Sequence, residues 1–241
     1  MASPQRIQAI MFDFHDTLVE LDQPATVIQA ANTAVYAGLK AHQLAASDGE
    51  FAEIWRPFFQ ESLRETPVFG AHSPYATSIQ AVATACGLTL TANDVATIVA
   101  AALAPWRSHT SLPDETRPAL TGLQQHYRLA VLSNFNHPAY IAAMLEHFGL
   151  TSFFSAVVVS GAVGLRKPNP AMFELVLDRL GVTAAMSVMI GDNPTEDMRG
   201  AQAAGCHTVL LDRYNRHPDY PGQRIATLLE SIPIIRTLDT P

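Results

Sequence analysis

Short apolar runs recur along the chain, and longer segments of helical character separate most of them. The runs cover residues 7–12, 129–132, 156–159, 188–190 and 208–211. Their unbroken apolar character indicates strands buried on both faces, as in a parallel sheet covered by helices. Helices are expected over residues 138–148, 170–180 and 194–204, each opening at a proline and followed by a glycine. This alternation predicts an α/β fold, with a doubly wound, Rossmann-like parallel sheet of about five strands and, beyond Asp212, a loop and a terminal helix.

The alternation stops between about residues 21 and 106. Apolar positions there recur at helical spacing and predict helices over residues 26–44, 50–64, 75–86 and 91–103. The last opens with a capping-box arrangement of Thr91 and Asp94. An all-helical stretch within a sheet domain is most simply an insertion joined by two linkers. We therefore expect residues 1–20 and 107–241 to form the sheet domain and residues 21–106 a helical insertion, with Pro105 and Pro113 in the return linker.

Composition and charge narrow the classes of function. Hydrophobic residues make up 48% of the chain and charged residues 15%, which is typical of a packed globular protein. The net charge of −7 and the lack of a basic cluster disfavour nucleic acid or an anionic membrane as a partner. Cys86 and Cys206 lack the spacing of a metal site. No signal peptide or membrane-spanning stretch is evident, so we expect a cytoplasmic protein, monomeric or homodimeric.

Polar residues follow the predicted strands. Ligands of an open parallel sheet bind beyond the carboxyl ends of its strands. The polar residues expected there are Asp13, His15, Asp16, Thr17, Ser133, Asn134, Lys167, Asp192 and Asp197. Clustered carboxylates suit a hard cation such as Mg²⁺, and a lysine beside that cation can offset the charge of a transferring phosphoryl group. The pattern predicts a site for a phosphate and a divalent cation.

The same residues resemble four motifs of the haloacid dehalogenase superfamily, most of whose members are phosphatases. Residues 10–18 are similar to its first motif, hydrophobic-Asp-x-Asp-x-Thr, and Ser133 to the end of its second. Residues 166–168, Arg-Lys-Pro, resemble the third, and residues 191–197, with Gly-Asp and a later Asp, the fourth. Each motif alone is weak, but four in the right order on the expected elements are specific. The helical insertion resembles the family's C1 cap, which closes over the substrate.

The resemblance implies a Mg²⁺-dependent hydrolase of a small phosphorylated metabolite, acting through an aspartyl-phosphate. Asp13 would be the nucleophile, Lys167 would neutralise charge, and Asp197 would support Lys167 or a metal-bound water. The implied Mg²⁺ ligands are the Asp13 carboxylate, the main-chain carbonyl of His15 and Asp192. The implied phosphate contacts are Thr17, which also fixes the loop, Ser133, Asn134 through its main-chain amide, and Lys167.

One position departs from the phosphatase pattern. Where the phosphatases carry an aspartate that protonates the leaving group and then activates water, this chain carries His15. Imidazole can perform both steps, and its unperturbed pKa near ~6.5 suits them at neutral pH. We therefore hypothesise that His15 takes the acid/base role. Two rival interpretations are a slowed hydrolysis of the intermediate and a purely structural histidine.

Three other functions stay open. The family's 2-haloacid dehalogenases attack carbon without a metal and also lack an aspartate at position 15, but they generally lack the Gly-Asp found here at residues 191–192. A phosphonatase would form an imine on an insertion lysine, for which only Lys40 is present. A non-catalytic ligand-binding protein would have no need to retain Asp13, Lys167 and Asp192 together.

The insertion carries aromatic and basic residues that could bear on the substrate. We interpret Trp55, Phe58, Phe59 and Phe69 as helix packing. The candidate substrate contacts are Arg56, Arg64, His72, Arg107 and His109. The polar loop of residues 212–217 either edges the site or lies on the surface. The sequence does not identify the substrate.

Overall fold

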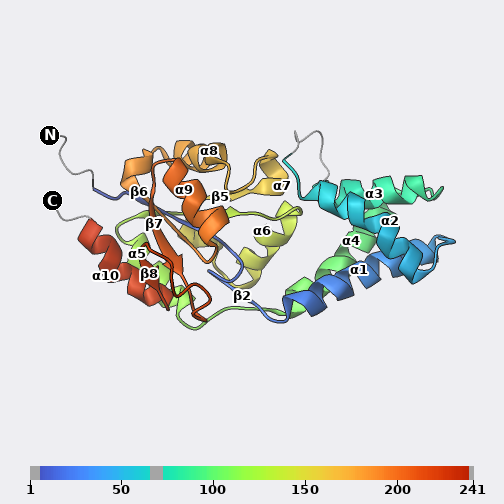
Figure 1. Cartoon of the computed structure of the whole chain (residues 1–241), viewed down its shortest axis with the longest axis horizontal. Helices are drawn as coiled ribbons and strands as arrows, with labels where there is room; N and C mark the ends of the chain where they lie inside the picture. Colours follow the sequence, from blue (N-terminus) through green and yellow to red (C-terminus); the bar gives the residue numbers. More distant parts are fainter. Residues whose placement is uncertain (1–5, 66–72, 239–241) are drawn as a thin grey trace.

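A six-stranded sheet forms the centre of the fold in the computed structural model, which describes residues 6–65 and 73–238 (Figure 1). Its strand order is β5-β4-β1-β6-β7-β8, and every neighbouring pair is parallel. The strands are β1 (Ala9–Phe12), β4 (Arg128–Ser133), β5 (Phe154–Val159), β6 (Ser187–Gly191), β7 (His207–Leu211) and β8 (Arg224–Ile225). The predicted α/β fold is confirmed. The sheet has one strand more than expected, because the two-residue β8 is too short to leave an apolar run in the sequence.

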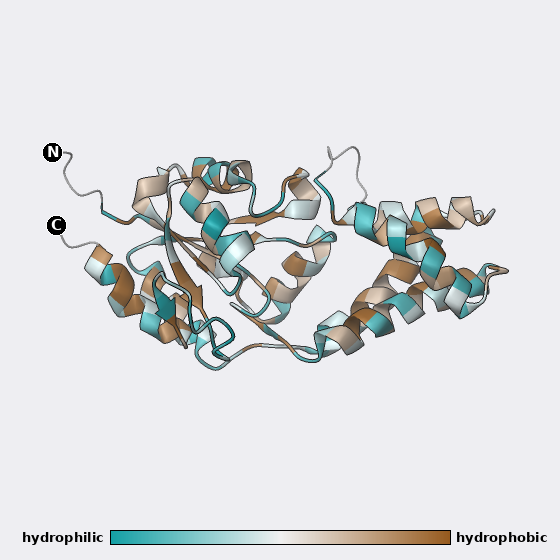
Figure 2. Cartoon of the chain, in the orientation of Figure 1, coloured by the Kyte–Doolittle hydropathy of each residue, from teal (hydrophilic) through white to brown (hydrophobic). Residues whose placement is uncertain are grey.

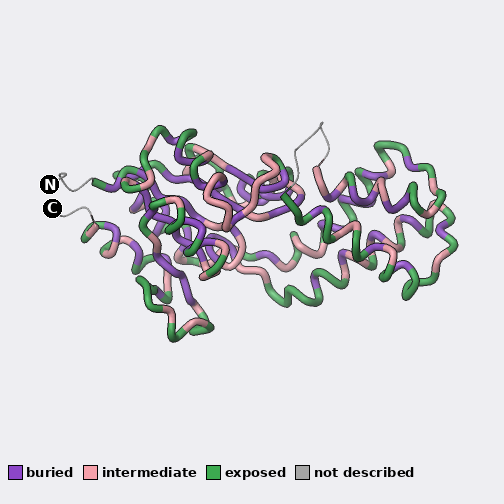
Figure 3. Tube along the Cα trace, turned by 45° about the horizontal axis from the view of Figure 1, so that its top comes forward, coloured by how far each residue is buried: buried purple, intermediate pink, exposed green. Residues whose placement is uncertain are grey.

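The central strand shows why these runs form strands. All four residues of β1 are fully buried. Ile10 and Phe12 pack into the apolar cluster on one face, and Ala9 and Met11 into the cluster on the other. Burial of one such large side chain contributes about 1.5–3 kcal/mol. Figures 2 and 3 show the apolar, buried strands between more polar and exposed helices.

Helices cover both faces of the sheet. On one face lie α8 (Pro170–Leu180), the π-helix η3 (Pro194–Arg199) and α9 (Gly200–Ala203). On the other lie α5 (Thr116–Gln124), α6 (Pro138–His147) and the terminal α10 (Ser231–Leu238). Shorter turns of helix are η1 (Thr151–Phe153), α7 (Ser160–Val163), η2 (Ala184–Met186) and η4 (Leu228–Glu230). The predicted helices over residues 138–148 and 170–180 are confirmed, and that over 194–204 opens with the wider π-turn.

The helices α1 (Pro24–Ala41), α2 (Asp48–Ser62), α3 (Pro74–Ala85) and α4 (Ala92–Ser108) form a separate group that extends from one end of the sheet domain (Figure 1). The strands β2 (Glu20–Leu21) and β3 (Thr110–Ser111) pair antiparallel, so the two connections to this group lie side by side. The capping box of α4 is confirmed, because Thr91 N–H donates to Asp94 Oδ2 at 2.8 Å and Asp94 N–H to Thr91 Oγ1 at 3.2 Å. The domain boundaries at residues 21 and 106 stay a prediction.

The end of α4 differs from the expectation. Pro105 was expected in the return linker, and this is wrong, because α4 continues past it to Ser108. Proline lacks a donor but keeps an acceptor, and its carbonyl accepts the His109 N–H at 3.1 Å. The helix therefore extends far enough to bring Trp106 beside the sheet domain. Within the described ranges, no helix has the length and apolar character needed to cross a membrane.

Candidate active site

Three neighbouring strands bring the predicted site residues to one edge of the sheet. The central strand β1 lies between β4 and β6. Asp13 follows β1 and its N–H donates to Ile190 O at 3.0 Å, Ser133 is the last residue of β4, and Asp192 follows β6. Carboxyl ends of parallel strands lie at the same edge, which is where open α/β sheets bind ligands. The predicted cluster of Asp13, Asp192 and Asp197 thus exists.

Lys167 lies at the centre of the cluster. Its side chain is 1% exposed, and Nζ donates to Asp13 Oδ1 and to Asp197 Oδ1, both at 2.6 Å. The Asn134 side chain holds the main chain of this lysine, since Nδ2 donates to Lys167 O and Oδ1 accepts the Lys167 N–H, each at 2.9 Å. The side chain of Asn134 therefore positions Lys167. No motif in the sequence predicted this contact. The phosphate contact expected of its main-chain amide stays a prediction.

The cluster contains three carboxyl groups and one ammonium group. Burial raises the pKa of Asp192 from 3.8 to about 8, and repulsion from Asp13 and Asp197 adds to the shift. Burial also raises the pKa of Asp197 to about 7, against the opposing effect of Lys167. Burial alone would lower the pKa of Lys167, but the two carboxylates that it contacts hold that pKa above its ordinary value. In the metal-free protein the crowding of acidic groups therefore favours the protonated form of Asp192 at pH 7.

This donor set fits a divalent cation with oxygen ligands, such as Mg²⁺. Carboxylate oxygens of Asp13, Asp192 and Asp197 lie within 4.8 Å of one another. Asp197 is already engaged, because Oδ1 accepts from Lys167 and Oδ2 accepts the Asn193 N–H at 3.0 Å. Asp192 forms no ion pair with any residue that the structure describes. Asp13 Oδ1 also accepts from Lys167, so the carboxylate oxygens without a bond to Lys167 or Asn193 are Asp13 Oδ2 and those of Asp192, while the main-chain carbonyl of His15 as a third ligand stays a prediction.

Gly191 makes room for Asp197. A Cβ atom at position 191 would lie 2.2 Å from Asp197 Oδ2, which is far inside van der Waals contact. Any larger residue at this position would displace the carboxylate that holds Lys167. In the Gly-Asp pair at residues 191–192, the glycine is therefore required for packing, and the aspartate contributes a carboxyl group to the cluster.

His15 lies in a cage of aromatic rings. Ring centroids of Phe14, Phe135, Trp106 and Tyr140 lie 5.0, 5.4, 5.8 and 5.8 Å from its own, and the Tyr140 ring is nearly parallel to it. The residue keeps some exposed surface, but Nε2 is buried and has no hydrogen-bond partner in the described chain. Burial lowers the pKa of His15 to about 4, against the opposing effect of Asp13. The imidazole is therefore neutral at pH 7 and is a weaker base than an ordinary histidine, so the unperturbed pKa that suits acid/base catalysis at neutral pH does not apply to the metal-free folded protein.

The polar loop after β7 edges the nucleophile loop. Arg213 is paired with Glu115 and donates from Nη2 to Thr17 O at 2.7 Å. Thr17 is fully buried, and its Oγ1 has no hydrogen-bond partner among the described residues. Arg213 therefore fixes the main chain of Thr17, the residue whose hydroxyl lacks a partner in the described part of the chain. The sequence left the place of this loop open, since its contact with Thr17 spans 196 positions.

Two further residues complete the description of the site region. Asp16 lies in the left-handed region at φ 56°, and its carboxylate accepts the Leu21 N–H at 3.3 Å. Glu196 accepts a hydrogen bond from Asn134 Nδ2 at 2.9 Å. No motif singled Glu196 out, because its contact depends on the turn of the π-helix.

The aromatic residues of the insertion pack as predicted. Trp55 stacks on Phe51 and contacts Phe59, which also lies against Tyr75. Phe58 is partly buried against the same cluster. Phe69 lies outside the described residues.

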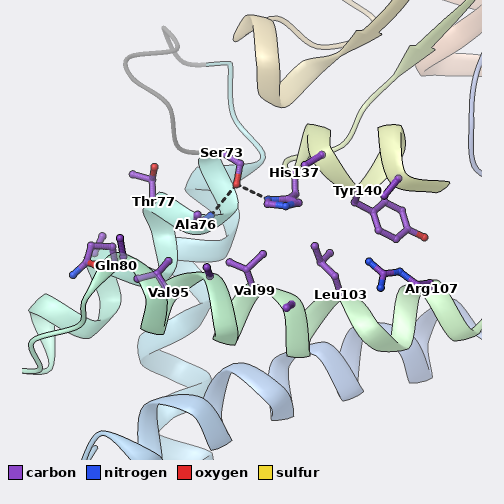
Figure 4. Close-up of a pocket in the computed structure, with 16 residues that line it drawn as sticks. Ser73, Ala76, Thr77, Gln80, Val95, Val99, Leu103, Arg107, His137 and Tyr140 are labelled. Carbon is purple, nitrogen blue, oxygen red and sulfur yellow. Dashed lines mark hydrogen bonds between the residues drawn. The ribbon is translucent and has the colours of Figure 1, made fainter. Parts of the chain in front are cut away.

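The basic candidates are dispersed. Arg56 pairs with Glu53 and Arg64 with Glu61 on exposed helix surface. His109 Nδ1 lies 2.9 Å from Pro105 O. Arg107 lines a large cavity between the insertion and α6 (Figure 4). His72 lies outside the described residues, and Lys40 donates to Leu44 O near the end of α1 away from the sheet.

Comparisons with known proteins show which family and which proteins this chain is similar to. A family model described as haloacid dehalogenase-like hydrolase matches residues 7–205. A phosphoserine phosphatase from Thermus thermophilus is 40% identical over 105 residues, which is 42% of each protein, so the match spans well under half of that relative. A 2-haloacid dehalogenase from Pseudomonas syringae superposes with a TM-score of 0.71 at 21% identity, over 96% of this chain and 98% of that one. A magnesium-bound hydrolase from Bacillus subtilis superposes with a TM-score of 0.61 at 22% identity, over 96% and 100%. The two superpositions show the fold alone.

Proposed function

The chain belongs to the haloacid dehalogenase-like hydrolase family, and we propose that it is a Mg²⁺-dependent phosphatase that acts on a small phosphorylated metabolite through an aspartyl-phosphate on Asp13. The observation that carries this proposal is the contact of Lys167 Nζ with Asp13 Oδ1 at 2.6 Å, beside the carboxyl group of Asp192, which forms no ion pair with any described residue. The phosphatase activity of the Thermus thermophilus relative supports it. We further propose that the protein acts in the cytoplasm on a small molecule, as a monomer or homodimer.

Each residue of the site has its own role in the proposed reaction. Lys167 holds one carboxylate oxygen of Asp13 and leaves the other free to attack phosphorus. The bond from phosphorus to the ester oxygen breaks as the new bond forms, and the alcohol leaves after taking a proton from solvent water. Ser133, the main-chain amide of Asn134 and Thr17 Oγ1 bind the phosphoryl oxygens. The Asp13 and Asp192 carboxylates and the main-chain carbonyl of His15 hold Mg²⁺, which supplies Lewis-acid stabilisation of the charge on the phosphoryl group. Asp197 keeps Lys167 in place through its contact at 2.6 Å.

His15 is assigned the proton transfer of the second step. When water attacks the aspartyl-phosphate, the neutral imidazole takes the proton of that water on Nε2, which has no other partner among the described residues. The bond between Asp13 and phosphorus then breaks and phosphate leaves. The cage of aromatic rings keeps the ring neutral and fixed in one orientation.

The helical insertion of residues 21–106 is proposed to act as the cap. It already contacts the sheet domain beside the site, since Asn136 Nδ2 donates to Ser62 Oγ at 2.8 Å and Arg166 N–H donates to Glu65 Oε1 at 2.9 Å. The paired β2 and β3 offer a narrow connection about which such a cap can move.

Phosphate release tests the proposal. A panel of phosphorylated metabolites is incubated with wild type and Asp13→Asn, with Mg²⁺ and with chelator. Asp178→Asn, on exposed surface of α8, is the matched control for loss of a carboxylate. Release that requires both Mg²⁺ and Asp13 supports the phosphatase. Halide release from 2-haloacids without phosphate release would replace it with a dehalogenase, and inactivity in both assays would favour a non-catalytic protein.

A further inference from the structure

A small cavity lies between the insertion and the sheet domain, and some of its lining residues contact His15 or Lys167. Its volume is about 240 Å³, below the roughly 300–1,000 Å³ typical of pockets for drug-sized ligands. Trp106 and Phe135 line it, and both belong to the cage around His15. Asn134, which holds the main chain of Lys167, lines it as well. The cavity is therefore placed to receive the group that carries the phosphate.

The cavity leaves apolar side chains uncovered. Ile28 and Leu63 line it and are 40% and 36% exposed, and they are two of the four large hydrophobic residues that the described chain leaves exposed. Phe59 and Leu103 extend the same apolar wall. Exposed apolar surface gathered in a concave site is stabilised when an apolar ligand covers it.

The three asparagines that line the cavity already have partners, and its other side-chain donors, the Tyr75 hydroxyl and the Trp106 indole N–H, carry no charge. Asn32 accepts the Trp55 Nε1–H at 2.9 Å, Asn134 bonds to Lys167, and Asn136 donates to Ser62 Oγ at 2.8 Å. Among the described residues that line the cavity, none is a lysine, arginine, histidine, aspartate or glutamate. A ligand carboxylate placed there would lose its hydration without gaining an ionic partner, which is strongly unfavourable.

A larger cavity of about 800 Å³ lies between α3, α4 and α6 (Figure 4). It shares Leu103 with the small cavity, and two of its lining residues are joined by the hydrogen bond of 2.6 Å between Ser73 Oγ and His137 Nδ1. Arg107 lines this larger cavity and not the small one. A short substrate group in the small cavity is therefore not paired with a cationic side chain of its lining.

We propose that the small cavity selects phosphomonoesters of a short, uncharged, apolar group over those that carry a carboxylate. This inference rests on the phosphatase function proposed above and assigns its substrate class. Phosphoserine, the substrate named for the Thermus thermophilus relative, carries a carboxylate and an ammonium group and falls in the disfavoured class.

Two phosphate esters of similar shape test the preference for an uncharged, apolar group. In 3-methylbutyl phosphate two methyl groups replace the two carboxylate oxygens of 3-phosphonooxypropanoate, and the phosphate end is the same. We expect kcat/KM of wild type with Mg²⁺ to be at least about tenfold higher for 3-methylbutyl phosphate. A preference for 3-phosphonooxypropanoate would overturn the inference and leave the phosphatase standing. No release from either ester or from p-nitrophenyl phosphate would remove the phosphatase and the inference with it.

Variants at the exposed apolar residues link the preference to the cavity. Leu63→Arg and Ile28→Arg each bring a cation into the cavity at a partly exposed position, so little packing is lost. Each is expected to lower the ratio of the two kcat/KM values by about tenfold or more. Leu229→Arg is the matched control, because Leu229 is 44% exposed and lies outside the cavity. An unchanged ratio in both cavity variants, or an equal change in Leu229→Arg, would overturn the inference.

Discussion

Asp192→Asn should stabilise the metal-free protein while it removes the response to Mg²⁺. In the folded state burial and the neighbouring carboxylates raise the pKa of Asp192 from 3.8 to about 8. The folded protein therefore holds a proton on Asp192 at pH 7, where the unfolded chain does not. Because the folded state binds more protons, the free energy of unfolding falls as pH rises from about 4 to about 8. Asparagine carries no charge, so the free energy of unfolding of Asp192→Asn does not fall with pH for this reason.

The size of the effect follows from the two pKa values. Holding a proton at pH 7, about three pH units above the ordinary value, costs roughly 4 kcal/mol at about 1.4 kcal/mol for each pH unit. The side chain is only partly buried, and solvent reduces the penalty. We therefore expect Asp192→Asn to raise the metal-free free energy of unfolding by about 2 kcal/mol at pH 7 and by less than about 1 kcal/mol at pH 5.

Mg²⁺ should reverse the order of stability of wild type and Asp192→Asn. A ligand at a hundred times its dissociation constant stabilises the folded state that binds it by about 2.7 kcal/mol. Wild type gains this stabilisation, and Asp192→Asn loses a ligand and gains much less. With saturating Mg²⁺ wild type is therefore expected to equal or exceed the variant in stability.

Urea denaturation followed by circular dichroism at pH 5, 6, 7 and 8, with chelator and with Mg²⁺, measures all of these differences. Asp178→Asn, at an exposed position on α8, is the control and should shift little under every condition. Part of the pH slope should persist in Asp192→Asn, because the pKa of Asp197 is also raised, to about 7. If Asp192→Asn is less stable than wild type in chelator at pH 8, or responds to Mg²⁺ as wild type does, the charge argument is wrong.

Two further substitutions test the packing and the chemistry of the site. Gly191→Ala should lower the free energy of unfolding by about 1–3 kcal/mol in the same urea assay, because its Cβ would lie 2.2 Å from Asp197 Oδ2, whereas Gly49→Ala, with no atom within 4 Å, should be neutral or stabilising. His15→Ala should lower kcat by about a hundredfold or more and let a phosphoryl group accumulate on Asp13, detectable by intact-protein mass spectrometry after rapid quenching. Unchanged turnover would instead make His15 a structural residue.

The sequence predicted the sheet and the charged cluster because both depend on local signals. Strands buried on both faces appear as unbroken apolar runs, and the residues that follow neighbouring strands must meet at one edge, which places Asp13 near Asp192. The extension of α4 past Pro105 was not predictable in this way. Proline lacks the N–H donor of other residues, but a helix tolerates this loss near its end, and the Pro105 carbonyl still accepts a hydrogen bond from His109. The side-chain contact of Asn134 with Lys167 depends on two loops 33 positions apart, and no pattern in either loop specifies it.

The aromatic cage shows how one substitution in a motif fits its surroundings. Trp106 comes from the end of α4, Phe135 from the loop after β4 and Tyr140 from α6, so only the folded chain brings them to His15. A carboxylate at position 15 would be enclosed by four aromatic rings, none of which carries a charge, and it would lose much of its hydration there. A neutral imidazole stacks on those rings instead. The departure at position 15 and the apolar cavity beside it therefore have one physical cause, because the side of the site formed by the insertion and the neighbouring loops is apolar while the sheet edge carries the charges.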